Sequence, residues 1–220
     1  APIVGVGTAL VAMASGFEDA MAKVATIADT SQVPLEQLRA EILNLSNETG
    51  VASESIADAV YNAISAGQET GNAVNFVANA TKLATAGFAD TGSALDVLTT
   101  IMNAYGMSAE DVTRVSDILI QTQNMGKTTV AELSAYMGKV IPTAKASNVS
   151  LEQVAAAYAK LTANGIQTAE STTYLNGMMN ELSKSGTKVS DAVRNQTGKS
   201  FQELMADGYS LTDVLAIVQT

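Results

Sequence analysis

The sequence predicts an all-α protein made of stacked antiparallel helix pairs, about 8–11 helices in total. Three observations support this prediction. Apolar side chains recur every three or four residues along most of the chain, and no useful stretch has the period-two alternation of a strand. Capping residues and glycines bound these apolar stretches. The helix-ending glycines, moreover, recur at intervals of 37, 39 and 39 residues: Gly50, Gly87, Gly126 and Gly165.

Residues 1–30 are predicted to form an N-terminal amphipathic helix, from about residue 8 to residue 28, that leads into the core. Residues 1–17 carry no charge, but they are fewer than the roughly 20 apolar residues of a membrane span and lack the basic start of a signal peptide. Their side chains instead continue a helix seam with steps of four and three: Ile3, Gly7, Leu10, Ala14, Phe17, Met21, Val24 and Ala28. We expect this helix to pack on the body or on a partner copy. Membrane contact through residues 1–17 is the alternative.

Residues 31–186 are predicted to form a helical repeat core. Pro34 suits a first helical turn because its φ is fixed and it has no N–H to leave unbonded. Ser108, with Asp111 three residues later, has the pattern of a helix cap. The expected helices of the first part run from Pro34 to Gly50, about Ser53 to Gly67, about Gly71 to Ala86, Ser93 to Tyr105, and Ser108 to Gly126.

The stretch 122–167 is the clearest copy of the repeated pattern. Thr129 with Glu132, and Ser150 with Gln153, match the capping box. Pro142 is expected to stop the helix that Thr129 begins. Gly126 and Gly165 are expected to close the preceding helices in the left-handed conformation. A two-helix unit near 39 residues is typical of solenoids, whose units bury their apolar faces against neighbours.

The C-terminal part of the chain departs from this period. The last core helix is expected from Glu170 to Leu182, and residues 187–220 are predicted to form a cap of short helices. These helices are expected at Ser190 to Asn195, at Ser200 to Ala206 and from Ser210 onward. The sequence starts with Ala and ends in an apolar run without a stop signal, so we expect it to be part of a longer chain.

Composition excludes several kinds of chemistry. The chain has no Cys and no His, which removes thiol nucleophiles, Ser-His-Asp triads and the common zinc sites. Residues 1–120 carry a net charge of −10 and residues 121–220 a net charge of 0, so specific nucleic-acid binding is not expected. The loose basic cluster, open to a phosphate-binding or a solvated-loop interpretation with the second favoured, is Lys184, Lys188, Arg194 and Lys199.

The remaining candidate sites have simpler interpretations. The adjacent acids Glu18-Asp19 and Glu110-Asp111 cannot face each other on a helix, and first-turn acids suit the helix dipole. The triplet Gly126-Lys127-Thr128 matches only the end of a phosphate-binding loop and follows a helix rather than a strand. The methionines on inward stripes are expected to fill the core: Met21, Met102, Met137 and Met178. We therefore predict no catalytic, cofactor-binding or metal-binding residue and no cofactor.

Four passages, in their order and spacing, resemble the conserved core region of phage tail tape measure proteins. They are FEDAMAKV at 17–24, LNLSNETGVASESIADAV at 43–60, LATAGFADTGSALDVLTTIMNAYGMSAEDVTRVSDIL at 83–119, and residues 122–167 continuing into ANGIQTAESTTYLNGMM at 163–179. The similarity covers most of residues 15–215. Residues 171–176 depart from it, because the family more often has a Gly-Thr-x-Leu-Arg run there.

The resemblance implies a structural protein of the virion tail, made in the host cytoplasm during assembly. Such proteins lie in the tail tube in several copies, set tail length through the length of the polypeptide, and leave ahead of the DNA during ejection. The implied partners are the tail tube protein, tail assembly chaperones, tail-tip proteins and further copies of the chain. A helical adaptor or membrane-interacting module is the alternative, and a carboxylate-based muramidase comes third.

Overall fold

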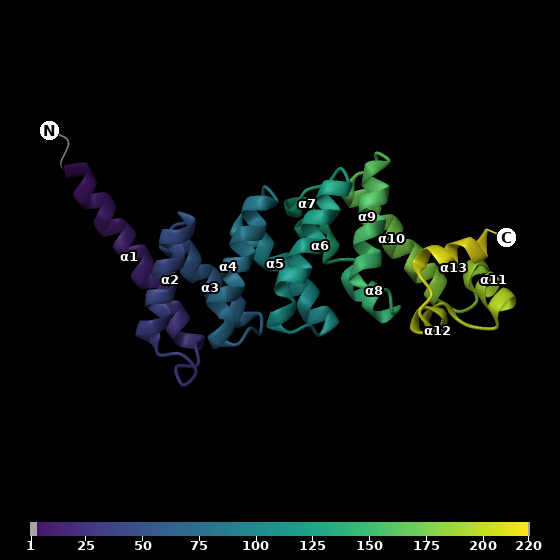
Figure 1. The fold of residues 1–220 in the computed structure, drawn as a ribbon, viewed down its shortest axis with the longest axis horizontal. Helices are drawn as coiled ribbons and strands as arrows, with labels where there is room; N and C mark the ends of the chain where they lie inside the picture. The colour runs from purple at the N-terminus through teal and green to yellow at the C-terminus, as the bar shows by residue number, and fades with distance from the viewer. Residues whose placement is uncertain (1–3, 220) are drawn as a thin grey trace.

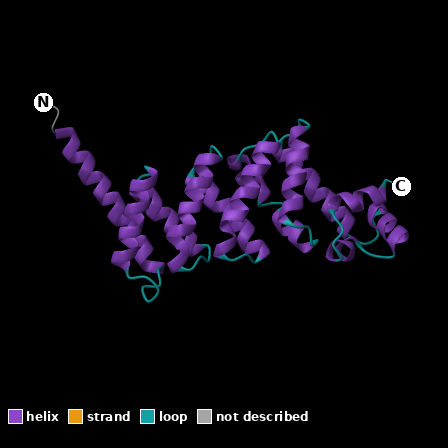
Figure 2. Ribbon diagram, in the orientation of Figure 1, coloured by secondary structure: helices purple, strands orange, loops and turns teal. Residues whose placement is uncertain are grey.

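The chain folds into a stack of helices. The computed structural model describes residues 4–219, and the side chains from residue 15 onward. The described part contains thirteen α-helices, one short 3₁₀ helix and no strand (Figure 2). The all-α class is therefore confirmed, and the number of helices exceeds the predicted 8–11.

The helices follow one another with short connections. Their bounds are α1 Val4–Ile27, α2 Leu35–Thr49, α3 Ser53–Ser65, α4 Thr70–Ala86, α5 Thr91–Tyr105, η1 Ala109–Asp111, α6 Val112–Met125, α7 Val130–Met137, α8 Ile141–Ala146, α9 Leu151–Ala163, α10 Thr168–Ser183, α11 Lys188–Thr197, α12 Phe201–Ala206 and α13 Leu211–Val218.

Alternate helices pack on one another in two rows. One row contains α1, α3, α5, α7 and α10, and the other contains α2, α4, α6 and α9. The stack is elongated, with the N-terminus and the C-terminus at opposite ends of its long axis (Figure 1). The short helices α11, α12 and α13 pack together beyond α10 at the C-terminal end.

Hydrogen bonds cross from each layer of the stack to the next. The amide of Asn103 donates to the carbonyl of Ala66 at 2.9 Å, 37 positions away. The Ser134 hydroxyl donates to the Ser93 carbonyl at 2.7 Å, 41 positions away. Contacts at these separations are what a repeat of this length produces, and the period near 39 itself stays a prediction. The division of the chain at residues 30 and 186 also stays a prediction.

Of the two glycines predicted to be left-handed, Gly165 is and Gly126 is not. Gly50 and Gly165 adopt positive φ, at +72° and +91°. Gly126, with φ −109°, and Gly87, with φ −96°, do not. A Cβ on Gly126 would lie 2.4 Å from Thr162 Oγ1, and one on Gly87 would lie 2.3 Å from Val130 Cγ2. The prediction of a left-handed Gly126 is therefore wrong. Glycine is needed at this position because α9 packs too closely to leave room for a Cβ.

The expectation that Pro142 stops a helix is also corrected. Helix α7 ends at Met137, and α8 begins at Ile141 with Pro142 in its first turn. Proline lacks an N–H, and the first-turn N–H groups of a helix have no intrahelical partner, so the residue suits a start as well as a stop. This division of one expected helix into two is one source of the higher helix number.

Of the two capping boxes predicted in residues 122–167, the first is complete and the second is half-formed. Thr129 and Glu132 make both reciprocal bonds. Ser150 accepts from the N–H of Gln153, but the Gln153 side chain accepts at 2.8 Å from the N–H of Leu211 in α13. The prediction of a complete second box is therefore wrong, because Gln153 bonds to a distant helix instead.

The second half of α1 lies against α3, and Phe17, Met21 and Val24 are buried there as expected. The helix begins at Val4, earlier than predicted. The other seam positions Ile3, Gly7, Leu10 and Ala14 lie outside the residues whose side chains are described. Within the described residues, no helix combines the length and the apolar character that crossing a bilayer demands.

Candidate interaction surfaces

The first adjacent carboxylates take part in helix packing. Both oxygens of Glu18 accept from the guanidinium of Arg39, at 2.5 and 2.6 Å, which joins α1 to α2. These hydrogen bonds lower the pKa of Glu18. Arg39 also lies over the Phe17 ring, 5.3 Å from its centroid. Glu18 is therefore an ion-pair partner at the surface.

The second pair, Glu110-Asp111, begins a helix as predicted. An Asp111 oxygen accepts from the backbone N–H of Ser108 at 3.1 Å. Arg114, one turn further on, donates to Glu152 of α9 at 2.5 Å and so links two layers. Among the residues that the structure describes, no three carboxylates are grouped closely enough to hold a metal ion.

The triplet Gly126-Lys127-Thr128 is part of a layer contact. The backbone N–H of Lys127 donates to Thr162 Oγ1 at 3.1 Å. The Thr128 hydroxyl is buried and accepts from Thr168 at 2.9 Å. A phosphate loop needs free backbone N–H groups, and here the Lys127 N–H already has a partner. The triplet therefore takes part in helix packing, and the absence of a phosphate-binding loop stays a prediction.

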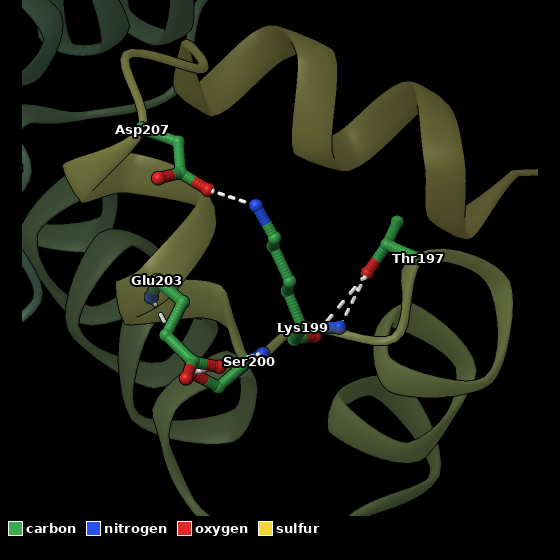
Figure 3. A network of polar contacts seen from close by, with 5 residues as sticks. All are labelled: Thr197, Lys199, Ser200, Glu203 and Asp207. Carbon is green, nitrogen blue, oxygen red and sulfur yellow. Dashed lines mark hydrogen bonds and ion pairs between the residues drawn. The ribbon is translucent and has the colours of Figure 1, made fainter.

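The basic cluster extends from Lys184 at the end of α10 to Lys199 in the C-terminal cap, and two of its four cations have acidic neighbours. Lys199 donates to Asp207 at 2.6 Å, an interaction that raises the lysine pKa (Figure 3). Glu203 accepts from the backbone N–H and the hydroxyl of Ser200, both at 2.7 Å, and these bonds lower its pKa, with a smaller contribution from Arg194. Lys188 and Arg194 lie in α11, whereas Lys184 and Lys199 lie in connecting segments. The interpretation of the cluster as solvated loop charge stays a prediction.

An apolar groove of about 630 Å³ lies between α9, α10 and α13. Its apolar lining comes from Ala156, Ala157 and Leu161 of α9, Tyr174, Leu175 and Met178 of α10, and Leu211 and Leu215 of α13. Gln153, Lys160, Ser210 and Thr212 add polar atoms. The Gln153–Leu211 hydrogen bond joins the α9 and α13 walls. Tyr174 is 51% exposed, so a large aromatic face is open to solvent.

This groove was not among the features predicted from the sequence. Met178 was expected on an inward stripe, whereas it is half-buried in the wall of the groove, together with Leu161. Met21, Met102 and Met137 are buried, as expected. The spacing of apolar residues along a helix is the same whether or not another helix covers them. The run of three alanines at 155–157 was the available signal, since small residues line surfaces that helices approach closely.

Comparison with known proteins decides the family. The sequence profile of the phage-related minor tail proteins matches residues 39–220. The chain belongs to this family. It is thus a component of a phage tail, and the resemblance to tape measure proteins is confirmed by individual relatives.

Two tape measure proteins match along nearly all of the chain. The probable tape measure protein of Clostridium phage phiCD119 is 39% identical over 229 aligned residues, which cover 98% of this chain and 24% of the relative. The tape measure protein of Pneumococcus phage Dp-1 is 22% identical and is covered to 19% of its length. The chain therefore spans a quarter or less of each of these relatives. No solved structure matches it.

Proposed function

We propose that this stack of helices is a structural, non-enzymatic part of a tape measure protein that sets tail length during assembly and leaves the tail ahead of the DNA. The 39% identity to a probable tape measure protein along nearly the whole chain carries this proposal. The proposed partners are the tail tube protein, the tail-tip proteins and the tail assembly chaperones, which the protein would meet in the host cytoplasm. The proposal includes no cofactor and no specific nucleic-acid contact.

The fold limits how much length this region contributes. Stacked helices are about 8–10 Å apart, so one unit of some 39 residues adds about 10 Å to the stack. The same residues in a single continuous helix would span about 58 Å. We propose that residues 1–220 act as a compact block, and that most of the measured length comes from other parts of the protein.

Tail lengths of phage mutants test both statements. The first mutant lacks residues 90–128, which keeps Thr129 as the cap of α7. The second lacks the same number of residues elsewhere in the protein. We expect electron micrographs to show little change for the first and tails shorter by up to about 58 Å for the second. Tail length that is independent of both deletions would refute the length-setting role, and a full-size change for the first would refute the compact block.

A membrane-interacting module is the second candidate, motivated by the uncharged residues 1–17. Co-sedimentation with phospholipid vesicles, using the chain with and without residues 1–16, tests it. We expect no binding by either form. Binding that disappears with the deletion would favour the second candidate over the first.

A further inference from the structure

Phe88, in the connection between α4 and α5, has a backbone conformation that phenylalanine rarely adopts. Its φ of +52° lies in the left-handed region, where a side chain crowds the backbone. Of the nine described residues with positive φ, seven are glycines, which have no side chain, and another is Asn148. Phe88 is the only bulky residue among them, so its conformation is strained.

The end of α4 does not require a side chain at position 88. The N–H of Ala89 donates to the carbonyl of Ala84 at 2.9 Å, which ends the helix with Phe88 as the left-handed residue. The same bond, from residue i to residue i−5, ends four other helices after a left-handed glycine: Gly67, Gly106, Gly165 and Gly208. Glycine would therefore form this turn without strain.

The Phe88 side chain is not packed inside its own chain either. It is 84% exposed, the largest exposed fraction among the large apolar side chains that the structure describes. A single apolar side chain at a surface is ordinary, but here the side chain also strains the backbone, and strained residues cluster at binding sites. A phenyl ring is stabilised most by burial among apolar and aromatic side chains. Strain and exposure together mark Phe88 as a contact residue.

The α9–α10–α13 groove has a lining that suits a phenyl ring. Its volume is about 630 Å³, and all three helices contribute apolar side chains. Tyr174 and Met178 line the groove, where they offer the aromatic and sulfur contacts that a phenyl ring favours. Tyr174 is 51% exposed, so its ring can be reached from outside. The groove can therefore bury an aromatic side chain.

The charges beside the two surfaces have opposite signs. Asp90, two residues after Phe88, accepts from the hydroxyl and the N–H of Ser93, and these bonds lower its pKa, so its carboxylate is ionised at neutral pH. Lys160 is an exposed member of the groove lining and takes part in none of the ion pairs formed within residues 15–219. Phe88 also belongs to the half of the chain with a net charge of −10, and the groove to the half with a net charge of 0. A contact between the two avoids placing two acidic surfaces against each other.

The ring and the groove cannot meet within one molecule, because α6 and α7 lie between the α4–α5 pair and the helices of the groove along the stack (Figure 1). We propose that Phe88 of one copy docks in the α9–α10–α13 groove of a second copy, with Asp90 placed to pair with Lys160. Because the two surfaces differ, a copy whose groove is filled keeps its own Phe88 for another groove. This contact is independent of the length-setting role proposed above.

Sedimentation velocity of the 220-residue chain at about 1–300 µM tests this contact, since interfaces of small area bind weakly. We expect the average mass to rise with concentration for the unchanged chain. Phe88→Gly should weaken association by about tenfold or more, the loss expected on truncating a buried aromatic anchor. Leu43→Ala is the matched control, because it removes another exposed apolar side chain from the same half of the chain. It should associate like the unchanged chain.

The thermal stability of Phe88→Gly separates a binding role from a structural one. Glycine relieves the backbone strain, and the side chain that is lost is 84% exposed. The Tm, measured at a concentration below that of association, should therefore rise by roughly 2–4 °C. Removing a phenylalanine that packed within its own chain would lower the Tm instead. The variant should be more stable and less associated, a combination that a folding defect cannot produce.

Ala156→Glu tests the groove side of the contact. Ala156 is an exposed residue of α9 in the groove lining, so a glutamate there places a charge where the ring would dock. It is expected to weaken association by about tenfold or more. Ala163→Glu, at an exposed position of α9 outside the groove, is the matched control and should associate like the unchanged chain.

Mixing the two defective variants gives the decisive result. The Phe88→Gly chain keeps its groove, and the Ala156→Glu chain keeps its Phe88. Each alone should be monomeric, while the mixture should form 1:1 dimers. Circular dichroism checks that both variants are folded. The proposal is overturned if the unchanged chain stays monomeric, if either variant associates normally, if Phe88→Gly lowers the Tm, or if the mixture contains only monomers.

Discussion

Replacing Gly126 with alanine is expected to destabilise the protein, although the backbone at this position is available to any residue. Its φ of −109° and ψ of −177° are extended, so alanine brings no backbone strain. The new Cβ would instead lie 2.4 Å from Thr162 Oγ1 and 3.0 Å from the Cα of Ala159 and from the Thr122 carbonyl oxygen. Either Thr162 must rotate or α6 and α9 must separate.

The magnitude follows from these contacts. Overpacking of a well-packed interface costs about 1–3 kcal/mol. Rotation of Thr162 would also break its 3.1 Å hydrogen bond with the Lys127 N–H, which is worth about 1 kcal/mol. We expect the free energy of unfolding to fall by about 2–3 kcal/mol. In a chain of this size the corresponding fall in Tm is roughly 5–10 °C.

Urea and thermal unfolding, followed by circular dichroism, measure the effect. Gly177→Ala is the matched control, because this helical glycine of α10 has nothing within 4 Å of an added Cβ. The control should raise stability by about 0.5–1 kcal/mol through helix propensity. Thr162→Ala removes the closest contact, so the double variant should lose less stability than the sum of the two single variants. If Gly126→Ala were neutral or stabilising, the close-packing explanation would be refuted.

Three further predictions concern single side chains. Ser171→Ala should stabilise by about 1 kcal/mol in urea unfolding, because the Ser171 hydroxyl is buried without a hydrogen-bond partner; a loss of stability would contradict this. Burial raises the pKa of Tyr105 and of Tyr158 to about 12 from 10.0. In the folded state these hydroxyls therefore stay protonated to a higher pH than in the unfolded state. The free energy of unfolding should fall as the pH rises from 10 to 12, and it should fall less steeply with pH in Tyr158→Phe. Gln153→Ala should speed hydrogen exchange in α13, because it removes the bond to the Leu211 N–H, and should leave exchange in α2–α6 unchanged.

The local signals in the sequence located most of the helices. Helix α9 runs from Leu151 to Ala163, as its cap at Ser150 and the closing Asn164-Gly165 predict. The predicted short helices of the cap are present, and Ser200 and Ser210 each form a full capping box. A cap or a glycine acts within about four residues, so one sequence is enough to find it. The first part of α1 and the division at Pro142 were the exceptions.

The interaction surfaces were less accessible to sequence reasoning. Glu18 and Asp111 bond to neighbouring helix residues, while the prediction that neither adjacent pair is catalytic still rests on helix geometry, which keeps neighbours from facing each other. The groove was missed, since Leu161 and Met178 have the spacing of core residues. The hydrogen-bond partner of Gln153 was also missed, because Leu211 is 58 positions away and no local sequence pattern indicates the contact.

The sequence by itself determined that this protein is helical, where most of its helices begin and end, and that it resembles tail tape measure proteins. These properties depend on apolar periodicity, helix caps and the order of residues, all of which can be found in short stretches of the chain without knowing which helices pack together. Only the tertiary structure decided that Gly126 is needed for close approach and that α9, α10 and α13 form a groove. Both depend on which helix lies next to which, and that is set by the packing of residues some 40 positions apart.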